Sequence, residues 1–267
     1  MTDYVIAVRT YKRPHMFQSH TLQIIKEQGL LDRLYVFVGS DISEYAALEP
    51  TLRYIQAPVG GHNAIRAICE YFPHGHPIVF LDDDLGQFRR YDICGDVFHS
   101  TGLHDTLLYG FTQAPFGFGF MTNKMWLKEL PLSRYSYTTM PGCCFGAYNQ
   151  PELITTSHAH CDDLLRTIQY FKAGIIPTTI FGAGFKTKYG TNAGGLQASG
   201  DRDNTLRVCE EIRPQVEGWV SRLHQQSCGL WTWKLLPSAT LKRKLGISTS
   251  KGPIVKFSST PVTVSFD

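Results

Sequence analysis

Three consecutive carboxylates, Asp82, Asp83 and Asp84, directly follow the apolar run Pro77–Leu81. An apolar run of this kind predicts a buried strand that delivers the acids to one edge of a sheet. Carboxylates this close together repel one another unless a cation offsets their charge. Their oxygen atoms suit Mg²⁺ or Mn²⁺, which keep coordination positions open for substrate phosphates. We therefore expect a divalent-cation site here, and the alternative is an acidic turn that caps a helix.

The elements that would position these acids alternate between strand and helix over the first ninety residues. Strands are expected at Tyr4–Val8, Leu34–Val38, Leu52–Ala57 and Pro77–Leu81. One helix is expected between Pro14 and Gly29, and a second where Asn63 can serve as the cap. This alternation implies right-handed crossovers and a mainly parallel sheet of the α/β class. Ligands of such sheets bind beyond the carboxyl ends of the strands, where the three acids would lie.

After residue 90 the pattern changes. Residues 91–150 are rich in glycine, aromatic residues and threonine, and they predict a smaller mixed-β region over one face of the sheet. A helix is expected at Asp162–Ala173, then a glycine-rich loop over residues 177–200, then a helix from Asn204 that Pro214 interrupts. We expect one domain over residues 1–223 and a basic C-terminal extension over residues 224–267.

Composition excludes several classes of protein. The chain has 267 residues, of which 43% are hydrophobic and 18% charged, so it is neither disordered nor collagenous. No apolar run reaches the ~18–20 residues of a transmembrane helix, and the first residues do not form a signal peptide. We therefore expect no membrane association, reduced thiols and a cytoplasmic location, which for a viral protein means the host cytoplasm.

The charge is unevenly distributed. The net charge is +3, but residues 218–267 hold seven Lys or Arg and one acid, which leaves a body of −3 and a C-terminal region of +6. Such asymmetry favours a polyanionic partner, and the alternative is a solvated basic segment. Trp231 and Trp233 lie among these cations, and we expect them in the core rather than on a nucleic acid.

Two groups of possible soft ligands also occur. His158, His160 and Cys161 superficially resemble part of a zinc cluster, but no second ligand pair follows at a suitable spacing, so zinc is not favoured. Cys143 and Cys144 are expected in a packed strand rather than in a redox site.

The strand followed by three Asp residues resembles the DXD motif of GT-A glycosyltransferases. The resemblance implies a Rossmann-like GT-A fold, with Asp84 on the metal and Asp82 on the metal and the donor sugar. It also implies that the acidic pair at the start of the later helix takes part in catalysis, with Asp163 as general base and Asp162 as an acceptor or sugar contact. The remaining donor-binding positions implied by the resemblance are Arg9, Thr10, Arg13, Gly61, Asn63, Arg66, Asp83 and Lys188.

The order of the segments TYKRP, GGHNAIR, LDDDL and YGTNAGGLQ over residues 4–210 resembles one subgroup, the TET/JBP-associated glycosyltransferases. That subgroup includes the base J glucosyltransferase and phage DNA-modifying enzymes. The resemblance implies inverting transfer of a sugar, expected to be glucose, from a UDP-sugar to the hydroxymethyl group of a 5-hydroxymethylpyrimidine in DNA, such as 5-hydroxymethylcytosine. A Mn²⁺ or Mg²⁺ cofactor is implied as well. The alternatives are a glycan or polysaccharide acceptor, and an inactive nucleic-acid-binding module of the same fold.

Overall fold

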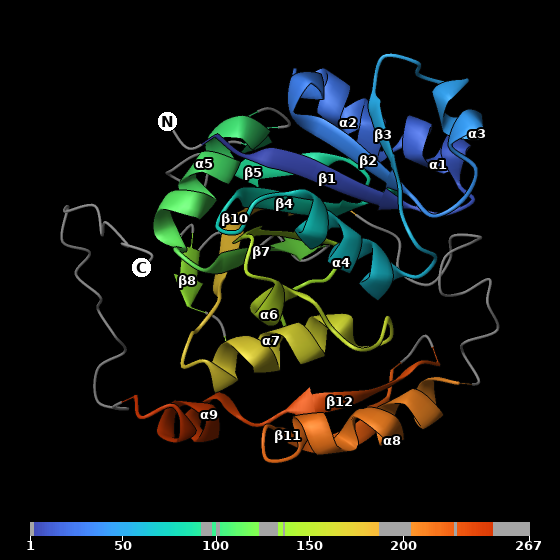
Figure 1. Cartoon of the computed structure of the whole chain (residues 1–267). Helices are drawn as coiled ribbons and strands as arrows, with labels where there is room; N and C mark the ends of the chain where they lie inside the picture. Colours follow the sequence, from blue (N-terminus) through green and yellow to red (C-terminus); the bar gives the residue numbers. More distant parts are fainter. Residues whose placement is uncertain are drawn as a thin grey trace.

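A mixed sheet of ten strands forms the centre of the molecule, with helices on both faces (Figure 1). The computed structural model describes residues 3–91, 98–99, 102–122, 133–135, 137–186, 204–226 and 229–247. The strand order is β3-β2-β1-β4-β9-β7-β10-β5-β6, and β8 pairs with β10. These described residues confirm the α/β class.

The first half of the sheet is parallel. It consists of β1 (Val5–Thr10), β2 (Leu34–Val38), β3 (Arg53–Gln56) and β4 (Pro77–Asp82). In the β1–β4 register Arg9 lies opposite Asp82, so the polar ends of these strands meet at one edge. The predicted strands are therefore confirmed, with ends that shift by one or two residues.

The second half mixes directions. It contains β5 (Phe88–Tyr91), β6 (Phe98–His99), β7 (Gly117–Thr122), β8 (Ser133–Tyr135), β9 (Cys144–Tyr148) and β10 (Thr178–Phe185). β9 runs antiparallel to both β4 and β7, and β7 is parallel to β10. β7 and β10 therefore point the same way as β4, and most strands share one direction, as expected. Cys144 lies buried in β9, which confirms its place in a packed strand.

Helices cover both faces of the sheet. One face carries α1 (Pro14–Ser19), α2 (Thr21–Glu27), α3 (Ile42–Ala46) and α5 (Leu103–Gln113), and a short 3₁₀ helix, η1 (Leu31–Arg33), precedes β2. The other face carries α4 (Gly61–Tyr71), α6 (Pro151–Ile154) and α7 (Asp162–Lys172). Successive residues of β4 alternate between the two layers: Val79 and Leu81 join the first core, and Ile78 and Phe80 join the second.

Several sequence predictions of helices were wrong in detail. The expected helix from Pro14 breaks into two at His20, where the backbone leaves the helical region. The second helix begins at Gly61, before Asn63, with Gly60 as its cap. The whole of α5 was missed because residues 91–150, rich in glycine, aromatic residues and threonine, were interpreted as mixed β. A Cβ at Gly110 would lie 2.5 Å from the ring of Phe118, so glycine allows this helix to pack closely on β7. The helix that begins at Thr205 continues through Pro214 to Val216.

The C-terminal residues form a further layer beneath α7, which consists of α8 (Thr205–Val216), β11 (Val220–Gln225), β12 (Trp231–Leu235) and α9 (Ser238–Lys244) (Figure 1). Apolar residues of α7 and α8 form a third core there. Trp231 and Trp233 pack against this core, and the indole Nε1 of Trp233 donates to the carbonyl of Cys209 at 2.9 Å. The core placement of both tryptophans is thus confirmed, and the expected domain boundary after residue 223 falls within β11.

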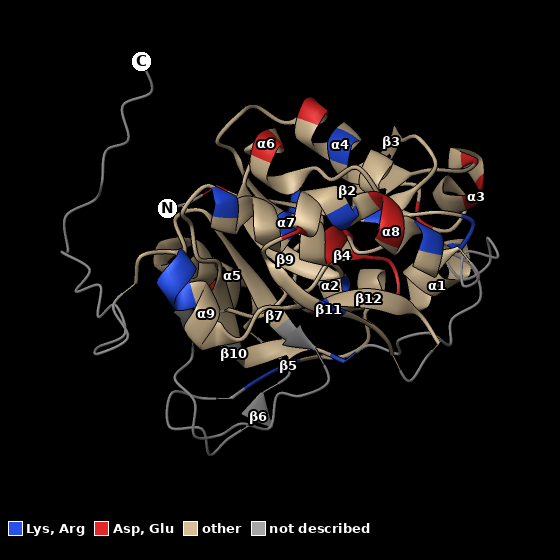
Figure 2. Ribbon diagram, turned by 90° about the horizontal axis from the view of Figure 1, so that it is seen from below, with Lys and Arg blue, Asp and Glu red and all other residues tan. Residues whose placement is uncertain are grey.

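The basic helix α9 lies far from the end of β4 (Figure 2). Leu245 and Ile247, which follow α9, line a hollow together with Gly117 and Thr178, the first residues of β7 and β10. Because β7 and β10 run in the direction of β4, this is the amino edge of the sheet, opposite the acidic triplet. No helix within the described residues has the length and apolar character needed to cross a membrane.

Candidate active site

The acidic triplet at the end of β4 divides between the two faces of the sheet. Asp82 lies on the same face of β4 as Ile78 and Phe80, and its side chain is 27% exposed. Asp83 faces the other layer, and its side chain is 0% exposed. Asp84, beyond the strand, is 17% exposed. Two carboxylates therefore reach the surface, and the one between them is buried.

Buried Asp83 has two strong partners. The hydroxyl of Thr10 donates to it at 2.6 Å, and Nη2 of Arg13 lies 2.7 Å from its other oxygen. Burial raises the pKa of Asp83 to about 7, although Arg13 and Thr10 act in the opposite direction. Nη1 of Arg13 also bonds Asp84 at 3.2 Å. Asp83 thus holds Arg13 beside Asp84, at the surface.

Arg9 connects the acidic triplet to the second acidic motif. Its Nε donates to Asp82 at 2.6 Å, and its Nη1 lies 3.5 Å from Asp162. Asp162 follows Asp82 by 80 residues in the chain. Its Nη2 donates to the carbonyl of Gly142 at 3.1 Å. Burial lowers the pKa of Arg9, but Asp82 and Asp162 outweigh this effect and raise it, so the guanidinium stays charged.

The two acids at the start of α7 titrate differently. Burial raises the pKa of Asp162, but Arg166 and Arg9 together outweigh it and lower the pKa; Nη2 of Arg166 lies 3.0 Å from its carboxylate. Burial and the charge of Asp162 raise the pKa of Asp163 to about 6, even though the backbone N–H of Leu164 donates to it at 2.7 Å. Asp162 is therefore a fixed anion, and Asp163 is an acid that exchanges its proton near neutral pH.

The start of α7 is tied to the end of β4 by the segment between them. The backbone N–H of Asp82 donates to the carbonyl of Cys143 at 2.9 Å. The backbone N–H of Met140 donates to the hydroxyl of Thr167 at 2.9 Å, and this hydroxyl in turn donates to the carbonyl of Asp163 at 2.7 Å. These hydrogen bonds hold the two acidic motifs in one place without a flexible link.

The GGHNAIR segment lies on the other side of Arg9. Gly60 has φ +105°, which suits glycine, and the carbonyl of Gly61 accepts from Nη1 of Arg9 at 3.4 Å. The amide of Asn63 donates to the carbonyl of Val59 at 2.9 Å and so closes the turn, while Arg66 is exposed. Our sequence reasoning missed His62; burial and the charge of Arg66 lower its pKa, and Asp162 acts against them. The position of His62 between Gly61 and Asn63, two residues that the sequence analysis did single out, was the sequence feature that could have indicated it.

The glycine-rich segment begins beside the triplet. The backbone N–H of Gly86 donates to the carbonyl of Lys186 at 2.7 Å, and the N–H of Lys186 donates to Gln87 at 3.0 Å. A Cβ at Gly86 would lie 2.7 Å from that carbonyl oxygen, so only glycine permits this approach. Lys188, expected to contact the donor, lies outside the described residues.

The two partly exposed carboxylates fit a divalent cation bound together with a substrate. Asp82 and Asp84 present hard oxygen donors at one edge of the sheet, and Arg9 and Arg13 lie beside them as phosphate-binding groups. Mg²⁺ and Mn²⁺ sites of this kind use one or two carboxylates and complete their coordination with water and substrate phosphates, without a cage made only of protein.

Comparison with known proteins bears on this fold. No family model and no curated protein matches the chain. Among solved structures, glucosyl-3-phosphoglycerate synthase from Mycobacterium tuberculosis superposes with a TM-score of 0.50 and 12% identity over 88% of each chain. The chain has the GT-A fold. The same synthase in complex with Mn²⁺ and UDP-glucose gives a TM-score of 0.50 and 11% identity over 88% of this chain and 87% of that chain. A mannosyltransferase from Pyrobaculum calidifontis, in complex with GDP-mannose and Mn²⁺, gives 0.49 and 14% over 80% and 66%.

The structure therefore brings most of the predicted site residues together. Arg9 contacts Asp82, Asp162 and Gly61, and Arg13 contacts Asp83 and Asp84. Thr10 is buried between Tyr45 and Asp83, where its hydroxyl is held by both side chains. The donor contacts expected of Thr10, Asn63, Arg66 and Asp83 remain predictions, since each of these residues is placed by the fold but none of the contacts is tested.

Proposed function

We propose that the chain is a metal-dependent, inverting hexosyltransferase that uses a UDP-sugar donor. The observation that carries this proposal is Arg9, which bonds Asp82 of the acidic triplet and also contacts Asp162 of the acidic pair. The acidic triplet and the acidic pair are thereby brought together at one edge of a GT-A sheet. The solved structure of a synthase that shares this fold, in complex with Mn²⁺ and UDP-glucose, adds support.

In the proposed reaction Asp163 removes the proton from the acceptor hydroxyl. The acceptor oxygen forms a bond to C1 of the sugar while the bond from C1 to the diphosphate oxygen breaks, and UDP leaves with the electron pair. Asp162, kept ionised by Arg9 and Arg166, raises the pKa of Asp163 and so makes it a stronger base. Asp163 then carries the transferred proton until solvent removes it.

The donor diphosphate is held by charge. A divalent cation at Asp82 and Asp84, when bound, would offset the negative charge that develops on UDP. Arg13 lies beside Asp84 and is oriented by buried Asp83, so its guanidinium is positioned before the donor arrives. In this proposal Asp83 and Thr10 position Arg13.

For the acceptor we propose the hydroxymethyl group of a 5-hydroxymethylpyrimidine in DNA, with glucose as the sugar. The resemblance to the TET/JBP-associated enzymes supports this, and so do three exposed cations around the site: Lys12, Arg66 and Lys186. Each belongs to a segment that begins or ends at the carboxyl edge of the sheet, where DNA phosphates could bind. The basic helix α9 lies at the opposite edge and does not support the same contact.

One experiment tests the acceptor. The protein is incubated with Mn²⁺ and radiolabelled UDP-glucose, together with DNA that contains 5-hydroxymethylcytosine, 5-hydroxymethyluracil or neither. Label in either modified DNA, and none in the unmodified DNA, is the expected result. Release of UDP without label in any DNA would contradict the DNA acceptor and favour a glycan or polysaccharide acceptor. If no UDP is released under any condition, the enzyme proposal fails and the inactive nucleic-acid-binding module remains.

A further inference from the structure

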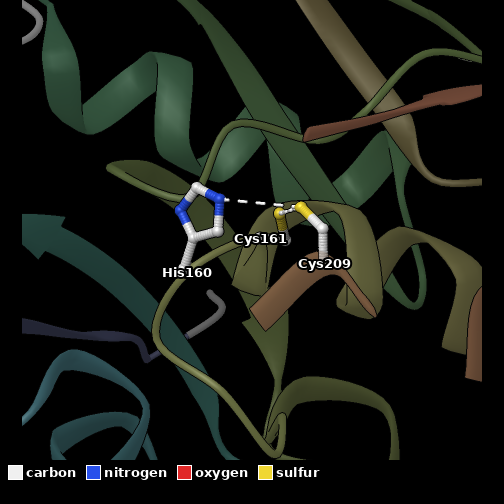
Figure 3. Close-up of side chains that lie close together, drawn as sticks. All are labelled: His160, Cys161 and Cys209. Carbon is white, nitrogen blue, oxygen red and sulfur yellow. Dashed lines mark hydrogen bonds between the residues drawn. The ribbon is translucent and has the colours of Figure 1, made fainter. Parts of the chain in front are cut away.

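A second cluster of metal-ligating side chains lies directly before the acidic pair (Figure 3). Among the described residues, His160, Cys161 and Cys209 place their ligand atoms within 4.8 Å of one another. The two Sγ atoms are 3.9 Å apart, and Sγ of Cys209 is 4.0 Å from Nε2 of His160. This cluster could not be predicted from the sequence because Cys209 lies on α8, 48 residues after Cys161.

The spacing suits a tetrahedral zinc ion. Bond lengths of about 2.3 Å to sulfur and about 2.0–2.1 Å to nitrogen place tetrahedral ligand atoms roughly 3.5–3.8 Å apart. The observed separations of 3.9 and 4.0 Å exceed this by only a few tenths of an ångström. A disulfide needs an S–S distance of about 2.05 Å, a much larger displacement for two side chains packed in a core.

Hydrogen bonds connect the cluster to β12. Nε2 of His160 donates to the carbonyl oxygen of Trp231 at 2.5 Å, and Sγ of Cys209 donates to the same oxygen at 3.4 Å. The hydroxyl of Thr232 lies 3.5 Å from Sγ of Cys161. Zinc would replace the protons of its ligand atoms, and two thiolates with one imidazole form a donor set that zinc accepts and that Mg²⁺ and Mn²⁺ do not favour.

The two thiols are shielded from solvent. Cys161 is 7% exposed and Cys209 is fully buried, and both are free thiols. Cys161 also adopts φ 64°, the left-handed region that non-glycine residues rarely occupy, and this conformation aims its thiol at α8.

We propose that His160, Cys161 and Cys209 bind a structural Zn²⁺ ion that fastens the C-terminal layer to the start of α7. The cluster joins three elements: the residues that precede α7, the middle of α8 and the first residues of β12. Asp162 and Asp163 follow Cys161 directly, so the ion fixes the backbone from which the acidic pair projects. This site is independent of the proposed transferase reaction, because it uses different ligands and a different class of metal.

The test begins with the zinc content of the full chain, purified under reducing conditions without chelator and measured by inductively coupled plasma mass spectrometry. We expect about one zinc per chain in the wild type. C161S and C209S should lose it, whereas C69S should keep it, since Cys69 is also a buried thiol but lies in α4, outside the cluster. D84N should also keep its zinc, which separates this site from the acidic triplet.

A spectroscopic measurement covers the case in which a serine variant fails to fold. Co²⁺ is substituted into the wild-type protein, and thiolate ligation produces a sulfur-to-cobalt charge-transfer band that a carboxylate site cannot give. We expect this band to appear at one equivalent and to disappear when Zn²⁺ is added. Absence of the band, a zinc content that survives both C161S and C209S, or a Cys161–Cys209 disulfide in place of the metal would each overturn the proposal.

Discussion

The two clusters that flank Cys161 and Asp162 differ in every property that matters for chemistry. The cluster toward β4 contains carboxylates and arginines, several of them partly exposed, and its charges oppose one another over short distances. The cluster toward α8 contains thiols and an imidazole, and its cysteines are buried. A charged, accessible cluster can bind and react with substrate, whereas a buried, soft cluster can hold elements together. The two clusters are adjacent in the chain: His160 and Cys161 belong to the second, and Asp162 and Asp163, which follow directly, belong to the first.

The sharpest test of the reactive cluster is the loss of the partly exposed acid Asp84. D84A should reduce sugar transfer more than about 1,000-fold, because the variant loses a proposed cation ligand and one of the two carboxylate partners of Arg13. Its melting temperature should stay close to that of the wild type, since Asp84 lies beyond the strand and is not part of the core. Transfer assays with Mn²⁺ and thermal unfolding measure the two quantities. Retention of full transfer would remove Asp84 from the metal site.

Replacement of the base should have a slightly smaller effect. D163N should lower transfer roughly 100–1,000-fold at unchanged donor KM, because an amide cannot accept the acceptor proton. The same variant should be more stable than the wild type at pH 8. The folded state raises the pKa of Asp163 to about 6, so the protonated form is favoured by folding, and the stability this gives is lost as pH rises through about 6. D162N, which keeps the Asp163 carboxylate but removes the fixed anion that raises its pKa, is the matched control. A D163N protein with near-normal transfer would place the base elsewhere.

The pH profile of the wild type sharpens the same assignment. Because the pKa of Asp163 is raised to about 6, transfer should increase with pH through about 6 and fall about tenfold for each unit below it. The residual activity of D163N should lack this rise between pH 5 and 7. A wild-type profile that is flat across this interval would contradict the raised pKa. Single-turnover rates measure the chemical step without interference from product release.

The success of sequence reasoning also differs between the clusters. The acidic triplet was predictable because a buried apolar strand and three carboxylates are adjacent in the chain, and parallel strands bring their ends to one edge. The inclusion of Asp162 and Asp163 in the same site as the triplet was predictable only through the family resemblance, and the contact between Asp162 and Arg9 was not predicted. The thiol cluster was not predictable, because Cys161 and Cys209 meet through the packing of α7 against α8 rather than through any spacing in the sequence. For the same reason, the sequence showed the basic charge of α9 but not the edge of the sheet at which this helix lies.

The structural cluster should affect transfer far less than the acids do. C209S should reduce transfer only about two- to tenfold, through displacement of the start of α7, while it lowers the melting temperature by several degrees. C69S, a thiol-to-hydroxyl change at another buried position, measures the cost of the substitution itself. We expect C69S to keep the transfer rate of the wild type. A C209S transfer rate as low as that of D163N would contradict a purely structural role for the thiol cluster.

The smallest effect is expected at α9. Because this helix lies at the amino edge of the sheet, K242Q/R243Q/K244Q should leave the affinity for DNA and its salt dependence unchanged within about twofold. Glutamine removes the charges but keeps most of each side-chain stem, so the packing of Lys242 on Tyr137 and of Lys244 on Trp219 is largely retained.

The matched variant at the carboxyl edge is K12Q/K186Q. If DNA phosphates bind beside the acidic triplet, this double variant should lower the slope of log K against log salt concentration by about 2, at ~0.9 per phosphate contact. Fluorescence anisotropy of labelled DNA at several salt concentrations measures both slopes. The opposite result, a reduced slope for the α9 variant alone, would place DNA on the edge of the sheet away from Asp163 and would separate DNA binding from the proposed chemistry.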